Sequence, residues 1–594
     1  MTESKPESEQ PDGPADHTCK AAERWLAEFR ERTGRAPKVL HIGNIANNAY
    51  LNSKLLREAG LQCDVICYDY LHIMGCPEWE EADFEGGYLD DFFPAWERVK
   101  MGGYKRPHWF AQGRQDTCIR YLTAARQGRA KTARLLRMRL ILECRLISWM
   151  GRKGLLPLAA KVRRAVGLLP RLLWRAPKKL VCRGLKQLLW PQGRPVPEAP
   201  DTLDESEQQP QVHCERSASQ SSSEETQPLV KERLRPTSEE PFDRRAAALV
   251  ECFKQVFPER EDALISEELM QYSSVVDKWS ELFDSYDVIV GYSTDPLLPL
   301  LAGNRPYLAF EHGTIRNIPF QPTTQGRLCA ISYRLADVSL ITNCDNYRSA
   351  ERLRLPNYRF IPHPVNESPV PREAAAKIRE SLEAEFDCDF VVFHPSRQHW
   401  EPDVRHPDWE KGNDIFFRGL ARFITETNSR AMCVCVAWGN SLEQSKQLLT
   451  DLGIADRVKW IKPQSSRQMV SYIQASDVTA DQFYLGAFGS TLPKAMLHGC
   501  PGMLYIDAEL HDWAFPEIPP VLNTRTSEDV FSSLERLYLS VEERERLARL
   551  GREWYLKYHS NQVIARGFVE AIRDAIQPVE QPADQSEPLN REAA

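Results

Sequence analysis

Short apolar segments alternate with helix-length segments in two separate parts of this 594-residue chain, and no other feature constrains its fold as strongly. The first part opens with a predicted buried strand at residues 38–43. A Gly/Asn turn follows, then a helix with Leu51, Leu55 and Leu56 on its apolar side, and a strand at residues 63–67. This β-α-β opening favours a parallel sheet.

The alternation stops near Gly113 and resumes after Arg245. A helix is predicted at residues 247–257, and short strands follow at 287–290, 306–310 and 338–342. The same sheet is therefore expected to continue, and the residues between its two parts form an insertion.

A second run of alternation predicts a second sheet. Its strands are expected at residues 389–393, 432–437, 458–461 and 502–506, and one last long helix at 541–576. The predicted fold class is α/β, with two Rossmann-like domains in series. Ligands of such folds bind beyond the carboxyl ends of the strands, so a cleft between the two sheets is the expected site.

The length is too great for a single core, and 42% hydrophobic residues suffice for two. The predicted parts are a polar leader with a helix (1–36), an N-terminal Rossmann-like acceptor domain (37–112 and 246–364), a basic amphipathic helical insertion (113–194), a disordered linker rich in Ser, Glu, Gln and Pro (195–245), a C-terminal Rossmann-like donor domain (365–576) and a disordered tail (577–594).

Charge is distributed very unevenly. Residues 126–194 hold 19 Lys and Arg and one acidic residue, Glu143, which gives this window a net charge of about +18. Because the net charge of the whole chain is −7, the remaining residues together carry about −25. On a helical wheel Arg134, Arg137, Arg145 and Arg152 share one arc, and the adjacent arc holds Leu135, Leu142, Leu146 and Trp149.

This window has three interpretations: a solvated helical pair, a nucleic-acid patch or a membrane-surface element. Leu and Trp interleaved with cations favour an anionic membrane surface over nucleic acid, and no nucleic acid is expected as a partner. The sequence has no run of eighteen uncharged apolar residues, and its start is polar and acidic. The predicted location is the cytoplasm, or the inner face of the plasma membrane as a peripheral protein.

Two loops of the second domain have the residues that bind phosphate. Arg397 follows the strand at 389–393, and Lys411 precedes a helix, so two cations flank a loop near a helix N-terminus. The loop Gly486, Ala487, Phe488 and Gly489 opens the helix that bears Lys494. Both loops are predicted to bind a diphosphate.

These residues resemble the group 1 retaining glycosyltransferases, which have the GT-B fold. The similarity includes the strand, Arg and Glu-Lys-Gly helix entry of residues 393–414 and extends over most of 361–576. The resemblance implies that Arg397 and Lys411 hold the diphosphate of a nucleotide-sugar donor.

The chain departs from that family at two positions. The family has two glutamates eight positions apart around its glycine loop, where this chain has Gly486 and Lys494. Asp477 and Asp481 are the nearby candidates for a replacement acid, and Lys494 is a further candidate for binding the donor phosphates.

In the first domain, Glu311, His312 and Arg316 follow a strand and are expected to face the cleft. They resemble the His-containing loop beside the transferred sugar in GT-B enzymes. His312 would position the reacting groups, Glu311 would orient it, and Arg316 would reach a phosphate or an anionic acceptor. On the opposite side, the turn with Gly43, Asn44, Asn47 and Asn48 is expected to line the acceptor side.

The predicted function is transfer of a hexose from a nucleotide sugar to a lipid-linked or polysaccharide acceptor, with retention. No cofactor or metal is expected, because no Asp-x-Asp motif stands beside the diphosphate loops. Two alternatives remain open: a catalytically inactive glycosyltransferase-like protein docked at the membrane, favoured by the lost glutamates, and a GT-B sugar-nucleotide epimerase, disfavoured by the long basic insertion.

Overall fold

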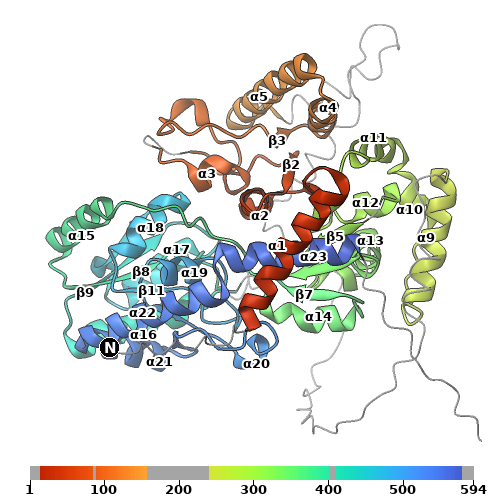
Figure 1. Ribbon diagram of the computed structural model, residues 1–594. Coiled ribbons are helices and arrows are strands. Elements are labelled where there is room, and N and C mark those ends of the chain that lie inside the picture. Colours follow the sequence, from red (N-terminus) through yellow and green to blue (C-terminus); the bar gives the residue numbers. More distant parts are fainter. Residues whose placement is uncertain (1–13, 85–88, 157–239, 305, 402–409, 578–594) are drawn as a thin grey trace, which may run out of the picture.

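The computed structural model describes residues 14–84, 89–156, 240–304, 306–401 and 410–577. Two parallel β-sheets lie in two halves of the molecule, each covered by helices (Figure 1). This confirms the predicted α/β class with two Rossmann-like halves.

The N-terminal sheet has seven parallel strands in the order β3-β2-β1-β4-β5-β6-β7. Its strands are short, and all except the half-buried edge strand at 358–360 are almost completely buried, as expected for a parallel sheet that is covered on both faces. They are β1 (Lys38–Ile42), β2 (Gln62–Tyr68), β3 (Phe110–Gly113), β4 (Val288–Tyr292), β5 (Tyr307–Phe310), β6 (Val338–Ile341) and β7 (Tyr358–Phe360).

Helices on both faces bury the apolar side chains of this sheet in two core clusters. The helices of this half are α1 (Pro14–Thr33), α2 (Asn48–Glu58), α3 (Pro77–Glu81), α4 (Gln115–Arg126), α5 (Ala130–Arg152), α9 (Phe242–Val256), α10 (Ser266–Met270), α11 (Ser273–Phe283), α12 (Leu297–Ala302), α13 (Thr324–Arg334) and α14 (Tyr347–Arg352).

The C-terminal sheet has six parallel strands in the order β10-β9-β8-β11-β12-β13. They are β8 (Phe390–His394), β9 (Ala431–Val436), β10 (Val458–Ile461), β11 (Val478–Ala480), β12 (Gly502–Leu504) and β13 (Leu522–Asn523). Around it lie α15 (Arg372–Phe386), α16 (Asn413–Thr427), α17 (Leu442–Asp451), α18 (Ser466–Gln474), α19 (Thr491–Leu497), α20 (Ala508–His511), α21 (Ser527–Leu539) and α22 (Val541–Tyr558).

The predicted long helix at 541–576 is wrong, because it is two helices that pack in different halves. α22 packs on α19 of the C-terminal half, whereas α23 (Asn561–Ile576) packs on α1, α2 and the N-terminal strands. Figure 1 shows blue α23 among the N-terminal elements. Its buried side chains, Ile564, Phe568, Val569, Ala571, Ile572 and Ala575, belong to the same core cluster as Trp25 of α1. The N-terminal core therefore includes both the start and the end of the described chain.

The predicted boundary of the insertion at residue 113 also needs correction. α4 and α5 pack against β2 and β3, and Leu122, Leu136 and Leu140 are part of the N-terminal core. Both helices thus belong to the N-terminal domain, because their apolar faces complete its edge. Residues 157–239, with most of the predicted basic segment and linker, lie outside the described residues, as does nearly all of the predicted tail.

Candidate active site

A cleft of about 410 Å³ separates the two halves and is lined by both. The strand order brings the loops after β1, β5, β8 and β11 to this cleft, as expected for ligand sites at the carboxyl ends of parallel strands. Seven of the predicted site residues line it: Asn47, Asn48, His312, Arg397, Lys411, Gly489 and Lys494.

The loop after β8 delivers Arg397 and Lys411 to the cleft. Gly412, which precedes α16, has a φ of +65°, a left-handed conformation that favours glycine. This sharp turn places Lys411 at the helix start, and its backbone N–H donates to His399 at 2.9 Å. The Asn413 amide donates to His394 Nε2 at 2.9 Å, which joins the helix start to the end of β8. These hydrogen bonds therefore fix Lys411 at the start of α16, beside the end of β8.

The surroundings of Lys411 disfavour its charge. Burial and the neighbouring Arg397 and Arg316 lower the pKa of Lys411 to about 8, although Asp481 and Asp345 act in the opposite direction. The Lys411 ammonium donates to the side-chain oxygen of Gln482. A protonated Lys411 would therefore be stabilised by an added anion.

Arg397 lies against an aromatic ring and close to the other half of the molecule. Its guanidinium is 5.1 Å from the centre of the Trp438 ring. Burial lowers the pKa of Arg397, and Tyr70 of the N-terminal half acts in the opposite direction. Arg397 thus lies against Trp438 in the cleft wall, where a guanidinium can bind phosphate oxygens through two parallel hydrogen bonds.

The glycine loop reaches the cleft with its last part. Gly489 and Lys494 line the cleft, whereas the ring of Phe488 stacks on His511, with centroids 5.5 Å apart, and on Phe515. Gly486 has a φ of +70° and accepts a hydrogen bond from Asp507 N at 2.9 Å. Ala487 is buried, and its carbonyl accepts from Gln482. Gly486, Ala487 and Phe488 therefore shape the loop, and Phe488 packs in the core.

Of the two nearby acids, one faces the cleft. Asp481 lines it and accepts from Ser396 Oγ at 2.7 Å, and burial raises its pKa. Asp477 instead forms an ion pair with Arg379 at 2.7 Å and accepts from Val391 N. Of these two acids, Asp481 is therefore the one placed in the cleft.

His312 faces the cleft with a defined hydrogen-bonding state. The Asn48 amide nitrogen lies 3.0 Å from His312 Nδ1. Because an amide nitrogen can only donate, Nδ1 is the acceptor and Nε2 of the neutral ring carries the hydrogen. Burial and Arg316 lower the pKa of His312 to about 4, so the ring is neutral near pH 7. His312 is thus a neutral donor in the cleft.

Glu311 was predicted to orient the His312 ring, but its carboxylate bonds to other groups. Its buried carboxylate accepts from the backbone N–H of Gly313, from the backbone N–H and hydroxyl of Thr342, both at 3.1 Å, and from the Asn343 amide at 3.2 Å. Glu311 therefore fixes the backbone that carries His312, and Asn48 orients the imidazole ring. Arg316 forms a two-bond ion pair with Asp345, which holds it beside the cleft.

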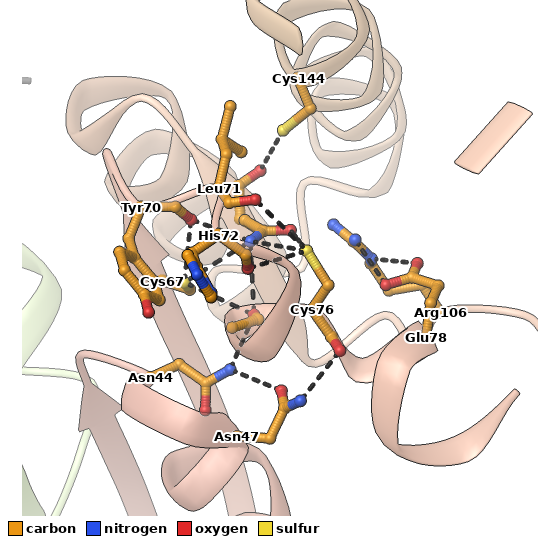
Figure 2. Close-up of polar contacts among 12 residues, drawn as sticks. Asn44, Asn47, Cys67, Tyr70, Leu71, His72, Cys76, Glu78, Arg106 and Cys144 are labelled. Atoms are coloured by element: carbon orange, nitrogen blue, oxygen red, sulfur yellow. Dashed lines mark hydrogen bonds and ion pairs between the residues drawn. The ribbon is translucent and has the colours of Figure 1, made fainter. Parts of the chain in front are cut away.

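The turn after β1 is held by its own asparagines (Figure 2). Asn44 donates to Asn47 Oδ1 and to the Gly75 carbonyl, both at 3.0 Å, and Asn47 donates to the Cys76 carbonyl at 2.9 Å. Gly43 lies at the base of the turn, with a φ of +93°. This network therefore presents Asn47 and Asn48 to the cleft, with Gly43 and Asn44 as its support.

Several residues that line the cleft are not apparent from the sequence. The ring of His363 lies 5.0 Å from that of His312, and the buried Nδ1 of His363 has no hydrogen-bond partner in the described part of the chain. The buried Oε1 of Glu80 also lacks a hydrogen-bond partner among the described residues. Glu80 follows Trp79 in α3, in a stretch without helical or strand periodicity, so no sequence signal marks it. Further polar lining groups are His72, Asp91, Asn343, Gln464, Ser490 and Thr491.

The described residues include no group of three or more His, Cys, Asp or Glu suited to a metal ion, and the absence of a metal requirement stays a prediction. None of the helices described is both long and apolar enough to cross a bilayer.

No protein-family model matches the chain. A 96-residue segment is 32% identical to D-inositol 3-phosphate glycosyltransferase from Corynebacterium diphtheriae, and the match covers 15% of this chain. The chain thus matches about a fifth (22%) of the length of this curated relative.

Similar solved structures include Anabaena HepE in complex with UDP, with a TM-score of 0.42 and 18% identity over 51% of this chain and 83% of HepE. Sucrose-phosphate synthase from Thermosynechococcus elongatus has a TM-score of 0.38 and 14% identity, over 51% and 79% of the two chains. The resemblance to glycosyltransferases expected from the sequence is confirmed by the curated relative over that short segment.

Proposed function

We propose that this protein is a glycosyltransferase that moves a hexose from a nucleotide sugar to a hydroxyl group of a lipid-linked or polysaccharide acceptor. The donor diphosphate occupies the C-terminal wall of the cleft, and the acceptor occupies the N-terminal wall. Retention of configuration is proposed from the resemblance to the retaining family.

The observation that carries this proposal is the group of cations on the C-terminal wall. Arg397, Lys411 and Lys494 line one cleft, and the pKa of Lys411 is lowered to about 8 because burial and nearby arginines oppose its charge. A diphosphate at this position pairs with all three cations and restores the charge of Lys411.

Catalysis then rests on stabilising the leaving group. The bond between the anomeric carbon and the diphosphate oxygen breaks, and its electron pair goes to the diphosphate beside Arg397 and Lys411. The acceptor hydroxyl forms the new bond to the anomeric carbon and passes its proton to the departing diphosphate oxygen, which completes the balance of the step. His312, with Nε2–H directed by Asn48, donates to the sugar and aligns it.

A second candidate function is binding without turnover, favoured by Gly486 and Lys494 at the family's glutamate positions. Asp481 beside Lys411 in the cleft supports turnover instead. An epimerase needs no acceptor, so dependence on an added acceptor separates it from a transferase.

The test is nucleotide release from a panel of sugar nucleotides, with and without added acceptors. Release by the wild type that is lost in Arg397→Ala/Lys411→Ala supports transfer at this site. The matched control is Arg422→Ala/Lys446→Ala, which removes one exposed Arg and one exposed Lys from the same half. Nucleotide binding that depends on Arg397 and Lys411, without release, would establish the binding protein instead.

A further inference from the structure

α5 lies at the edge of the N-terminal half (Figure 1), and one of its faces carries exposed apolar side chains. These side chains recur every three or four residues and so form one continuous row, which we call the α5 ridge. The exposed fractions are 67% for Leu135, 55% for Met138, 62% for Leu142, 56% for Leu146 and 46% for Trp149.

The opposite face of α5 fixes the direction of this ridge. Leu136 and Leu140 are buried in the N-terminal core. Arg137 donates to the Arg106 carbonyl at 2.9 Å, Cys144 to the Gln112 carbonyl at 3.3 Å and Arg152 to the Phe93 carbonyl at 2.6 Å. Arg137 and Arg152, two of the four arginines predicted on one arc, are therefore hydrogen-bonded to the N-terminal domain. The ridge on the other face of α5 points away from that domain.

Cations surround the ridge on all sides. Lys131 and Lys153 lie near its two ends, and Arg134, Arg139 and Arg145 lie along its flanks, all of them exposed. The single acidic residue of α5, Glu143, forms an ion pair with Arg139 at 2.8 Å. The face thus combines a row of large apolar side chains with a positive border.

We infer that the α5 ridge docks on the surface of an anionic lipid bilayer, with the helix parallel to the membrane. The Leu, Met and Trp side chains enter the boundary between head groups and acyl chains, and the bordering Lys and Arg contact lipid phosphates. Long cationic side chains bury their stems at such a boundary and keep the charge at the head groups.

Charge argues against two other occupants. A second copy of this chain would bring two positive borders together, which opposes a symmetric contact. Nucleic acid would pair with the cations, but it would leave the aliphatic ridge without a matching surface.

The docked face lies close to the acceptor wall of the cleft. A cavity of about 290 Å³ under α5 is lined by Leu140 and Cys144 on one side and by Leu71 and Cys76 on the other, and His72 and Met74 of the same segment line the cleft. Hydrogen bonds join the two sides (Figure 2): Cys144 donates to the Gln112 carbonyl, and Cys76 donates to the Gln112 side-chain oxygen. Asn47 of the cleft wall in turn donates to the Cys76 carbonyl. Docking at α5 therefore brings the acceptor wall close to the bilayer surface, which fits a lipid-linked acceptor.

The experiment compares binding of the full chain to phosphatidylglycerol and phosphatidylcholine vesicles by co-sedimentation. The test variant is Leu142→Asn/Leu146→Asn, and the matched control is Leu539→Asn/Leu556→Asn, whose leucines are 76% and 51% exposed in the C-terminal half. We expect wild type and control to bind phosphatidylglycerol vesicles, and the test variant to bind at least about tenfold more weakly. A third variant, Arg134→Gln/Arg145→Gln, should lose about fivefold per cation.

Three results would overturn the inference. These are a wild type that does not bind phosphatidylglycerol vesicles, a test variant that binds them as wild type does, and self-association through the ridge in sedimentation experiments without vesicles. Unchanged melting temperature and UDP affinity of the variants establish that the fold is intact. Because vesicle binding is measured without any sugar nucleotide, it can fail or succeed independently of the proposed transferase activity.

Discussion

The two walls of the cleft differ in charge and in how the chain builds them. The C-terminal wall is cationic, and its main groups, Arg397, Lys411 and Lys494, come from one continuous domain. The N-terminal wall is neutral or acidic. Three separate segments bring its groups together: Asn48 follows β1, His72, Glu80 and Asp91 lie between β2 and β3, and His312 follows β5.

This difference indicates a division of work between the walls. A wall of fixed cations suits a ligand with one constant, highly charged part, such as a diphosphate. A wall of amides, imidazoles and carboxylates suits hydroxyl groups, whose hydrogen bonds can run in either direction. Changes to one wall should therefore affect donor binding, and changes to the other should affect turnover and acceptor use.

The largest effect is expected for Lys411→Met. UDP affinity should fall about 30-fold, the equivalent of about 2 kcal/mol for a charged hydrogen bond. The melting temperature without ligand should not fall, because the lowered pKa of Lys411 shows that its buried charge is unfavourable in the free protein. Calorimetric titration and thermal unfolding measure the two quantities. A lower melting temperature with unchanged UDP affinity would give Lys411 a structural role.

A smaller effect, about tenfold on kcat, is expected for Asn48→Asp. A carboxylate accepts from Nδ1–H, so it moves the hydrogen of His312 from Nε2 to Nδ1 and removes the donor that faces the cleft. UDP affinity should stay the same. Nitrogen NMR of the His312 ring reports the tautomer directly. Full activity with the altered tautomer would show that the Nε2–H bond is dispensable.

The pH dependence of UDP affinity should report on Lys411 of the C-terminal wall. Lys411 has a pKa of about 8 in the free protein, and a bound diphosphate raises this pKa. Above about pH 8, UDP binding therefore takes up a proton, and UDP affinity falls as the pH rises. The expected loss is about fivefold between pH 8 and 9. Lys411→Arg should abolish it, because arginine stays protonated. A loss that persists in Lys411→Arg would assign the titration to another group.

The smallest effect is expected for Glu80→Gln, which leaves the shape of the acceptor wall intact. Its Oε1 is buried in the cleft wall and lacks a hydrogen-bond partner in the described residues. The acceptor KM should rise about threefold without a change in UDP affinity. Steady-state kinetics with a fixed donor concentration measures it. A change in UDP affinity instead would contradict the separation of the walls.

The sequence predicts the C-terminal wall well, because its residues stand just after a strand or at the start of a helix, and both kinds of boundary are marked in the sequence. Arg397 after β8 and Lys411 before α16 were identified in this way. Phe488 was placed in the donor site because it belongs to the glycine loop, but its ring has apolar and aromatic neighbours that a local pattern cannot reveal.

The N-terminal wall was predicted only in part. Asn47, Asn48 and His312 follow strands, as the C-terminal groups do. His72, Glu80 and Asp91 lie between β2 and β3, where the chain has few regular elements, and tertiary contacts alone bring them to the cleft. The prediction that Glu311 orients the His312 ring also missed its actual partners, Thr342 and Asn343. These residues follow β6, the next strand of the sheet, so only the tertiary fold brings them to Glu311.

The packing of α23 in the N-terminal core has a consequence for biosynthesis. A ribosome makes the whole C-terminal half up to α22 before it makes α23, so that half can complete its contacts first. The N-terminal half is begun first, yet until α23 arrives it lacks Phe568 and Ile572, two fully buried side chains of its core. During translation, the domain that begins the chain is therefore the last to become complete.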